Sequence, residues 1–373
     1  MKEEAGKADS GWRADGSTRP QLSWMLKLPG YAPVAMCWLT AALLLVLTAF
    51  LTSGVGAFDT SYDVIWRLWL SPFHPQWAEG IDERVRYIVI HVRLARVCLA
   101  LTVGGALALA GAVYQGVLLN PLADPFTLGV STGAAFGAAL HLLIGWGAGQ
   151  FLGMSTLPVA AFTGALAALY LVYLLGRVDG RVHATTLVLA GIIVSTFLSA
   201  WIGLLKSLNE DSVSTIVFWV MGSLSAKGWL HVLLVLPYLT AGGAMILFYA
   251  RELDLLTLGD VQAQHLGVNV QQVRFRLMLA ASLVTAAAVS VSGVIGFVGL
   301  VVPHLVRLAI GPHHRRLLPA VLLAGALLVL LSDTVARSLL PSGQELPVGV
   351  VTAILGGPFF CYLMLHRKKY LQL

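Results

Sequence analysis

Residues Arg93 to Ala139 read RLARVCLALTVGGALALAGAVYQGVLLNPLADPFTLGVSTGAAFGAA, and this segment indicates the fold class of the whole chain. It begins with arginines, continues as an apolar run rich in Gly and Ala, and breaks at the segment from Asn120 to Pro125. A second apolar run then opens on small residues. A bilayer core about 30 Å thick needs about 20 apolar residues per helix, so the pattern predicts two membrane helices separated by a turn.

The composition of the whole chain agrees with this prediction. Mean hydropathy is +0.82, and 58% of the 373 residues are hydrophobic while only 11% are charged, against about 25% charged in soluble domains. The apolar runs lack the alternating pattern of a membrane β-barrel. A net charge of +6 is typical of Lys and Arg retained on the cytoplasmic side, so we expect a lipid bilayer as partner and no nucleic acid.

The chain is therefore predicted to be an all-α, polytopic membrane protein with about ten transmembrane helices. A polar cytoplasmic tail is expected over 1–33, a single transmembrane domain over 34–366, and a basic cytoplasmic tail over 367–373. The apolar segments lie near 34–52, 94–118, 126–145, 156–175, 185–206, 229–249, 274–293, 296–310, 317–340 and 347–366.

The distribution of basic residues predicts the orientation. With the amino terminus inside, the cytoplasmic connections hold Arg177, Arg251 and Arg315, and the short outer loops 146–155, 294–295 and 341–346 contain no Lys or Arg. The positive-inside rule then places both termini in the cytoplasm. The first outer connection, about 53–93, breaks the pattern because it carries several arginines.

Two connections are expected to contain short helices. Residues 212–225 are apolar but too short to span, which indicates an interfacial or re-entrant helix. Residues 253–267 predict two short cytoplasmic helices joined at Gly259, with Asp260 able to cap the second and Gly267 able to end it. An ordinary surface loop is the alternative for this segment.

Motifs for chemistry are missing from the sequence. There is no phosphate-binding loop, no catalytic signature and no metal-ligand spacing, and His313 and His314 are best interpreted as part of a solvated loop. The best intramembrane carboxylate is Asp333, with Arg337 four residues on; a local ion pair and a role for Arg337 at the outer surface both remain open. Energy for transport is therefore expected from another subunit.

A weak internal repeat is also visible. Gly111 precedes Pro121 by the same spacing as Gly293 precedes Pro303, and arginines lie upstream of both glycines. Since the two runs would cross in opposite directions, the spacing suggests inverted halves, as in many transporters.

Several motifs, in order along the chain, resemble the FecCD-type permeases, which are membrane subunits of ABC importers for iron-siderophores, haem and cobalamin. The resemblance covers about 35–366. The motifs are Arg93-Leu-Ala-Arg96, GAVYQGVLLNPLADPFTLGVSTG (111–133), LAG (189–191), WVMGS (219–223), LGDVQAQHLG (258–267), SGVIGFVGLVVPHLVR (292–307) and ELPVGVVTAILGG (345–357).

The resemblance implies a type II ABC importer permease architecture in the cell inner membrane. It implies a homodimer, two cytoplasmic ATPases that hold ATP and Mg, and an extracytoplasmic binding protein that delivers an iron chelate (siderophore or haem) or cobalamin. This chain is expected to be no enzyme and to bind no cofactor or metal itself. A proton-coupled secondary carrier and an intramembrane enzyme are the alternatives, the latter disfavoured because no polar catalytic constellation is present.

Three sets of site residues follow from matching positions to the family. The outward arginines expected to meet the binding protein are Arg93, Arg96 and Arg337. The residues expected to couple to the ATPase are Leu258, Gly259, Asp260, Gln264, Leu266 and Gly267. The residues expected at the translocation pathway or gate are Thr185, Thr186, Gly191, Ser195, Asn120 and Pro121, although Ala184 departs from the small hydroxyl residue common there.

Overall fold

The computed structural model describes residues 31–56, 58–144, 150–151, 154–178, 181–208, 210–340 and 344–367. The chain divides into two compact units, Met1–Leu43 and Leu44–Leu373. Of the first unit, the described part is helical from residue 31 onward, and everything below concerns the second. The two predicted tails, 1–33 and 367–373, lie almost wholly outside the described residues.

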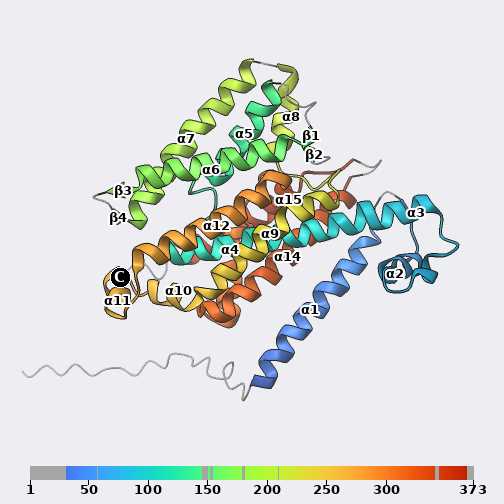
Figure 1. Ribbon diagram of the computed structural model, residues 1–373, viewed down its shortest axis with the longest axis horizontal. Coiled ribbons are helices and arrows are strands. Elements are labelled where there is room, and N and C mark those ends of the chain that lie inside the picture. Colours follow the sequence, from blue (N-terminus) through green and yellow to red (C-terminus); the bar gives the residue numbers. More distant parts are fainter. Residues whose placement is uncertain are drawn as a thin grey trace, which may run out of the picture. The chain divides into compact units, whose positions relative to one another are not determined.

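The described secondary structure is helical apart from two small antiparallel hairpins, β1–β2 and β3–β4 (Figure 1). The elements, in chain order, are α1 Tyr31–Ser53, α2 Tyr62–Leu70, the 3₁₀ turn η1 Pro75–Ala78, α3 Glu83–Tyr87, the π-helical η2 Ile88–Leu94, α4 Ala95–Val117, α5 Val130–Ile144, β1 Gln150–Phe151, β2 Met154–Ser155, α6 Leu157–Leu175, β3 Arg177–Val178, β4 Arg181–Val182, α7 Ala184–Leu208, α8 Glu210–Val220, α9 Trp229–Phe248, α10 Ala250–Leu256, α11 Asp260–His265, α12 Val270–Ser292, α13 Val298–Ile310, α14 His314–Ser338 and α15 Val348–Arg367.

All ten apolar segments predicted from the sequence are helices in the structure. Among the described residues, six helical stretches are long and apolar enough to cross a membrane, and the four shorter apolar helices are Trp38–Ser53, Val130–Ile144, Val298–Ile310 and Val348–Tyr362. Of the short segment predicted near 212–225, the part up to Val220 is helical, as α8, and residues 221–225 are not. The all-α fold class is therefore confirmed.

Helix α4, the first half of the opening stretch, is the centre of the bundle. It is buried almost throughout and packs against α9, α12, α13 and α14 (Figure 1). Glycines allow this packing: a Cβ on Gly104 would lie 2.3 Å from the carbonyl oxygen of Gly325, and a Cβ on Gly111 would lie 2.1 Å from that of Gly299. Small residues let membrane helices approach closely, so the Gly-rich composition sets the position of α4.

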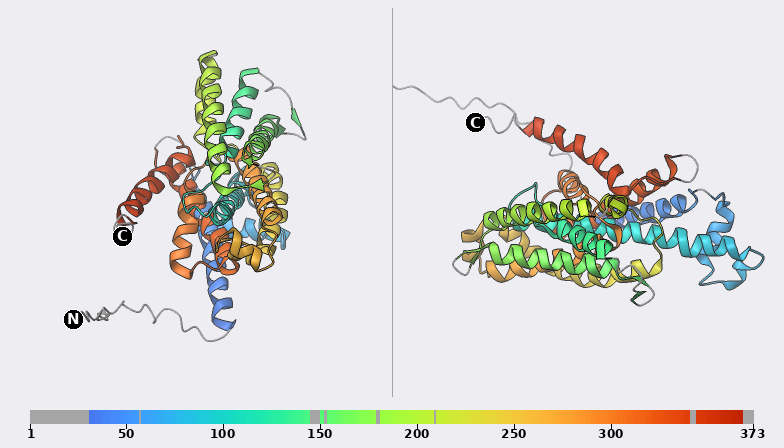
Figure 2. Two further views of the ribbon diagram at one scale, coloured as in Figure 1. Left: turned by 90° about the vertical axis from the view of Figure 1, so that its left-hand side faces the viewer. Right: turned by 90° about the horizontal axis from the view of Figure 1, so that it is seen from above.

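A second group, α5, α6 and α7, packs together beside this centre, as both Figure 1 and Figure 2 show. Gly133 and Gly137 of α5 face α6 in the same way, with ideal Cβ atoms 2.5 Å from Gly164 O and 2.2 Å from Ala160 O. Helix α12 contacts both α6 and α4 and so joins the two groups.

The proposed repeat spacing does not mark equivalent positions. Gly111 lies inside α4, whereas Gly293 follows the last residue of α12 with φ of 68°. Pro121 lies in the turn after α4, whereas Pro303 lies inside α13. The equal Gly-to-Pro spacing is therefore not evidence of structural symmetry.

Helices α4 and α14 pack side by side, and each extends from one end of the bundle to the other. At the start of α4, Arg96 meets Asp333 near the end of α14. At the end of α4, an ideal Cβ on Gly116 would lie 2.8 Å from Leu253 of α10 and 3.2 Å from His314, the first residue of α14. Twenty residues of helix separate Arg96 from Gly116, about 30 Å, which matches the thickness of a bilayer core.

Candidate functional site

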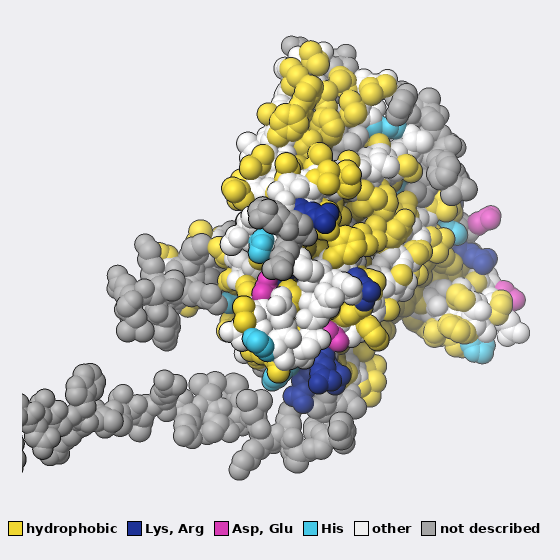
Figure 3. Space-filling view, turned by 60° about the vertical axis from the view of Figure 1, so that its left-hand side comes forward, with side chains coloured by type: hydrophobic (Ala, Val, Ile, Leu, Met, Phe, Trp, Pro, Cys, Tyr) yellow, Lys and Arg dark blue, Asp and Glu magenta, His cyan; other side chains and the backbone are white. Residues whose placement is uncertain are grey.

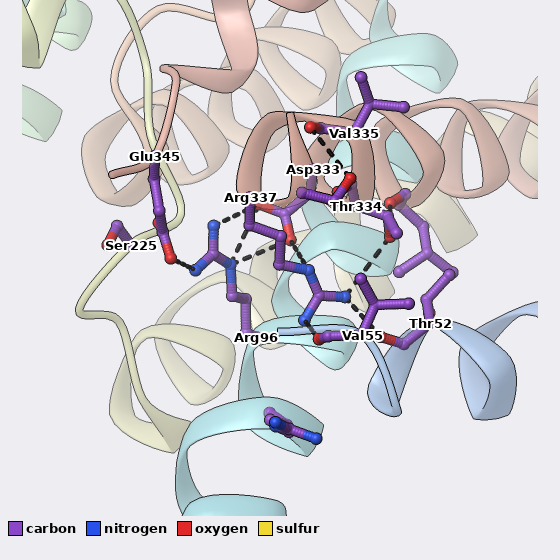
Figure 4. Close-up of polar contacts among 12 residues, drawn as sticks. Thr52, Val55, Arg96, Ser225, Asp333, Thr334, Val335, Arg337 and Glu345 are labelled. Atoms are coloured by element: carbon purple, nitrogen blue, oxygen red, sulfur yellow. Dashed lines mark hydrogen bonds and ion pairs between the residues drawn. The ribbon is translucent and has the colours of Figure 1, made fainter. Parts of the chain in front are cut away.

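The first end of the bundle holds a buried cluster of charges (Figure 4). The Arg96 guanidinium donates from Nε and Nη2 to the Asp333 carboxylate, at 2.9–3.1 Å, and from Nη1 to Glu345 at 2.8 Å. Arg337 Nε lies 3.7 Å from Asp333 Oδ2, so of the two readings left open for Arg337 the local ion pair is present. Arg96 is only 7% exposed and Asp333 is fully buried.

Arg93 and Arg337 contact backbone carbonyls at the carboxyl end of α1 and in the loop that follows it. Arg337 donates to Thr52 O at 2.7 Å and to Val55 O at 3.0 Å. Arg93 donates to Ser53 O at 3.1 Å and also to Gly54 O and Phe58 O. The last carbonyls of a helix lack partners within the helix and carry partial negative charge, so cationic side chains stabilise them.

The arginines predicted to face a partner are therefore buried within this chain. Arg93 is 5% exposed. The guanidinium groups of Arg93 and Arg96 both donate hydrogen bonds to acceptors within the chain. The exposed arginines nearest in sequence are Arg84 and Arg86 of α3. Glu345 was not among the predicted site residues, because it is 249 positions away from Arg96 in the chain.

Glu345 is the accessible member of the cluster, with its side chain 30% exposed. It lies in the connection before α15. Burial on its own would raise its pKa, but the hydrogen bond and charge of Arg96, assisted by Ser225, outweigh burial and lower the pKa. Glu345 is therefore ionised at neutral pH and remains a partner for Arg96.

The opposite end of the bundle carries the two short helices α10 and α11. They are joined at Gly259, whose φ of 102° is rarely adopted by other residues. Leu258 and Leu266 are 56% and 58% exposed, and Gln264 is exposed too. The predicted pair of short helices joined at Gly259 is confirmed, and an ordinary loop is excluded.

One detail of this segment differs from the prediction. Asp260 is the first residue of α11 and not its cap; its carboxylate accepts hydrogen bonds from Arg274 of α12 at 2.6 and 3.1 Å. Gly267, with φ of 85°, ends α11 as predicted. The long-range partner Arg274 outcompetes a local cap because its two N–H groups match a carboxylate.

Helix α10 is also fixed to α14. The Asp254 carboxylate accepts from the backbone N–H of His314 at 2.9 Å and lies 2.6 Å from its Nδ1. His314 is 3% exposed, so the interpretation of this histidine as part of a solvated loop was wrong. Asp254 and Asp260 thus attach the α10–α11 segment to two long membrane helices, α14 and α12.

The break after α4 is a turn organised by two side chains. Asn120 Oδ1 accepts from the N–H of Leu122 at 2.9 Å, and Asp124 Oδ1 accepts from the N–H groups of Phe126 and Thr127 at 3.0 and 2.9 Å. Burial raises the pKa of Asp124 to about 6, although these two backbone hydrogen bonds act in the opposite direction.

Helix α7 brings two of the expected gate residues to this break. Gly191 lets α7 approach Thr127, since an ideal Cβ would lie 2.0 Å from Thr127 O. Ser195 donates to Phe126 O at 3.4 Å. The pathway role itself stays a prediction, but Gly191, Ser195 and the break do lie together.

The remaining expected gate residues lie elsewhere. Thr186 donates to Gly176 O at the end of α6 and to His183 O just before α7, and Thr185 is exposed. Pro121 is half-buried in the turn. Within the described ranges, no group of three or more His, Cys, Asp or Glu side chains could hold a metal ion.

Comparisons with known proteins agree on one family. The family model described as the FecCD transport family matches residues 43–366. The chain is 40% identical over 332 residues to the hemin transport system permease protein of Yersinia pestis, covering 88% of this chain and 94% of that protein. It is 43% identical over 289 residues to the cobalamin import system permease protein of Halobacterium salinarum, covering 78% and 76%.

A solved structure supports the same assignment. It shows an inward-facing conformation of a metal-chelate type ABC transporter, and it matches with a TM-score of 0.76 at 33% sequence identity. The match covers 89% of this chain and 99% of that one. The similarity therefore extends over the whole transmembrane bundle.

Proposed function

The chain belongs to the FecCD transport family and is the membrane permease of an ABC importer, and we propose that it carries a metal chelate into the cytoplasm. The cargo class is an iron chelate (siderophore or haem) or cobalamin, in keeping with the hemin and cobalamin permeases among its relatives. Family membership favours this ATP-driven mechanism over a proton-coupled carrier.

The observation that carries the proposal is the arrangement of α10 and α11. They expose apolar side chains, Leu258 and Leu266, at one end of the bundle while Asp254 and Asp260 attach them to α14 and α12. We propose that this segment docks on a cytoplasmic ATPase. A rigid attachment to long helices would transmit closure of the ATPase to the membrane domain, as in shear and hinge motions.

A homodimer is proposed because α7 and α15 present unpartnered apolar faces. Their large exposed side chains include Ile193, Phe197 and Trp201 on α7 and Ile354 and Leu355 on α15. Hydrophobic side chains also gather over much of the face seen in Figure 3. A second copy is proposed to cover part of this surface and lipid the rest, with the pathway between the copies beside Gly191 and Ser195.

Docking of a binding protein is proposed at the end that holds Arg96. Arg84 and Arg86 of α3, which precedes α4 in the chain, are exposed. Their positive charge would steer an acidic partner toward this end. Nη1 of Arg96 binds Glu345, whose side chain is 30% exposed. A carboxylate of the binding protein would therefore compete with Glu345 for this nitrogen. Arg93 and Arg337 are proposed to support this edge by fixing the end of α1.

We also propose where ATP is bound and how the chain lies in the membrane. The chain hydrolyses no ATP itself; ATP and Mg are held by two partner ATPases, and this chain holds no cofactor or metal of its own. It lies in the cell inner membrane with both termini in the cytoplasm. The single transmembrane domain is taken as 34–366.

Capture of the ATPase tests the coupling segment. The chain is purified with its ATPase subunit, and Leu258→Asp and Leu266→Asp are compared with Phe73→Asp, a control that is 78% exposed and distant in sequence. Loss of the ATPase in the first two variants and retention in the control is expected. Normal capture in all three would remove the segment from the ATPase interface.

Charge reversal tests the docking end. Arg84→Glu with Arg86→Glu should weaken capture of the binding protein and reduce the salt dependence of what remains, because exposed charge pairs are screened by salt. Arg251→Glu, an exposed arginine at the start of α10, is the control. An unchanged salt dependence would exclude Arg84 and Arg86 from docking.

A further inference from the structure

A groove of about 350 Å³ lies between α6 and α12, beside the β3–β4 hairpin. Its long walls are apolar, with Leu166, Leu169 and Tyr173 on α6 and Phe275 and Met278 on α12. Tyr173 and Phe275 are in contact, with ring centroids 5.4 Å apart. The volume is within the range of small-molecule sites, about 300–1,000 Å³.

The apolar part of the groove opens toward lipid. Both α6 and α12 are long and apolar enough to span a membrane. At its rim Tyr170 is 62% exposed and Phe275 is 44% exposed. Large apolar side chains exposed on spanning helices face acyl chains, so the molecules that reach this opening are lipids.

One end of the groove is polar. Val182 of β4 forms part of the wall, and its backbone N–H donates to Gln271 Oε1 at 3.1 Å while its carbonyl accepts from Gln271 Nε2 at 3.4 Å. Arg177 of β3 pairs in register with Val182 and is exposed. An arginine therefore lies beside the polar end on the hairpin.

A second arginine forms part of the wall itself. Arg274 is 2% exposed and lines the groove. Its Nη1 donates to Val182 O at 2.9 Å, and both Nη atoms donate to Asp260. Its Nε has no hydrogen-bond partner within the described part of the chain. A buried donor without an acceptor is unfavourable, because it has lost its hydrogen bond to water.

We propose that this groove binds one anionic phospholipid, with an acyl chain between α6 and α12 and the phosphate at the polar end near Arg177 and Arg274. Both requirements of such a ligand are present together: an apolar slot that opens to the bilayer, and arginines where the slot meets the membrane surface. Basic pockets between membrane helices on the cytoplasmic side bind acidic headgroups in this way. The phosphate supplies the acceptor that Nε lacks after a small adjustment of the side chain.

The site is connected to the α10–α11 segment through one side chain. Arg274 forms part of the groove wall and also binds Asp260, the first residue of α11. A bound lipid would hold Arg274 and the hairpin in place, and with them the position of α11. This consequence rests on the proposed role of α11 in coupling to an ATPase; lipid binding itself does not.

Lipid binding is tested on the purified full chain, without ATPase. Native mass spectrometry in detergent, with added phosphatidylglycerol or phosphatidylethanolamine, measures the fraction of chain that retains each lipid. We expect the wild-type chain to retain phosphatidylglycerol preferentially. Arg177→Gln should reduce retention about fivefold, because one arginine near the surface contributes about 1 kcal/mol.

Two further variants locate the acyl chain. Leu169→Trp fills the groove and should abolish preferential retention, whereas Leu171→Trp, on a different face of α6, should leave it unchanged. Arg177 is exposed, so its substitution tests the proposal even if the groove-filling variant fails to fold. Equal retention of the two lipids, or retention unaffected by both Arg177→Gln and Leu169→Trp, would overturn the proposal.

Discussion

Arg96 and Asp333 form a bidentate ion pair between α4 and α14 although they are 237 residues apart in the chain. Asp333 is fully buried, and Arg96 uses its remaining edge on Glu345. Charges removed from water are tolerated only when they are paired and hydrogen-bonded, so each member of the pair depends on the other. The pair therefore fixes the amino end of α4 to the carboxyl end of α14.

Removal of the Asp333 charge should destabilise the protein strongly. In Asp333→Asn the buried Arg96 keeps Glu345 as its only carboxylate partner among those described. Breaking a buried ion pair costs about 3–5 kcal/mol. Thermal unfolding of the purified chain in detergent measures the effect. The control is Asp63→Asn, which removes an exposed pair with Arg67 at 3.9 Å and should change stability by about 0–1 kcal/mol. Similar melting temperatures for both variants would show that the Arg96–Asp333 pair is not needed.

Adding one methyl group to Gly111 should disrupt the crossing of α4 and α13. In Gly111→Ala the new Cβ would lie 2.1 Å from Gly299 O, which is backbone and cannot move aside. Overpacking of this kind costs about 1–3 kcal/mol or more. Gly203→Ala is the matched control, because nothing lies within 4 Å of its Cβ, and there the better helix propensity of Ala should be neutral or favourable. Melting temperature in detergent distinguishes the two, and equal values would contradict the tight crossing.

Stability should depend on the protonation of Asp124. Its pKa is raised to about 6 by burial, above the ordinary value of about 3.9. A raised folded-state pKa contributes stability that is fully present below about pH 4 and is lost as pH rises through about 6. Asp124→Asn keeps an oxygen acceptor for the two backbone N–H groups but cannot ionise.

The measurement is the difference in melting temperature between Asp124→Asn and wild type as a function of pH. The melting temperature of the variant relative to the wild type should rise between about pH 4 and pH 6. Above that range the difference should stay constant. The difference corresponds to the order of 2–3 kcal/mol, from about two pKa units at 1.36 kcal/mol each. A difference that does not change with pH would show that Asp124 ionises normally.

Substitution of Gly259 should uncouple ATP hydrolysis from transport. Gly259→Ala strains a backbone with φ of 102° and ψ of 157°, which essentially only Gly adopts, at a cost of about 1–3 kcal/mol. The strain should shift α11 relative to α10. Transport per ATP hydrolysed, measured with the ATPase in proteoliposomes, should fall. Gly80→Ala is the control, since Gly80 also has a positive φ, 77°, and open space around it. Equal coupling ratios in the two variants would remove Gly259 from the coupling mechanism.

Local patterns predicted a large part of this molecule. The ten apolar segments became helices because length and hydrophobicity alone are sufficient to specify membrane helices. The short helices around Gly259 were predicted because Gly259 and Gly267 are local signals for the junction and for the end of the second helix. The pair Asp333–Arg337 was one of two readings open from the sequence, because residues four apart share a helix face.

Partners that are distant in the chain were not predicted. Asp260 was expected to cap its own helix, but it binds Arg274. His314 was expected in solvent, but it packs against Asp254. In each case the competing partner comes from another element, and no periodicity or local propensity encodes which elements meet.

The membrane environment, the helices of segment 93–139 and the break from Asn120 to Pro125 could be read from the chain alone, because each depends on local composition and on residues a few positions apart. The roles of the arginines in this segment follow only from how the helices pack. Arg93 binds the carbonyls at the end of α1 and Arg96 binds Asp333 and Glu345, because a buried guanidinium requires acceptors, and packing determines which acceptors are within reach.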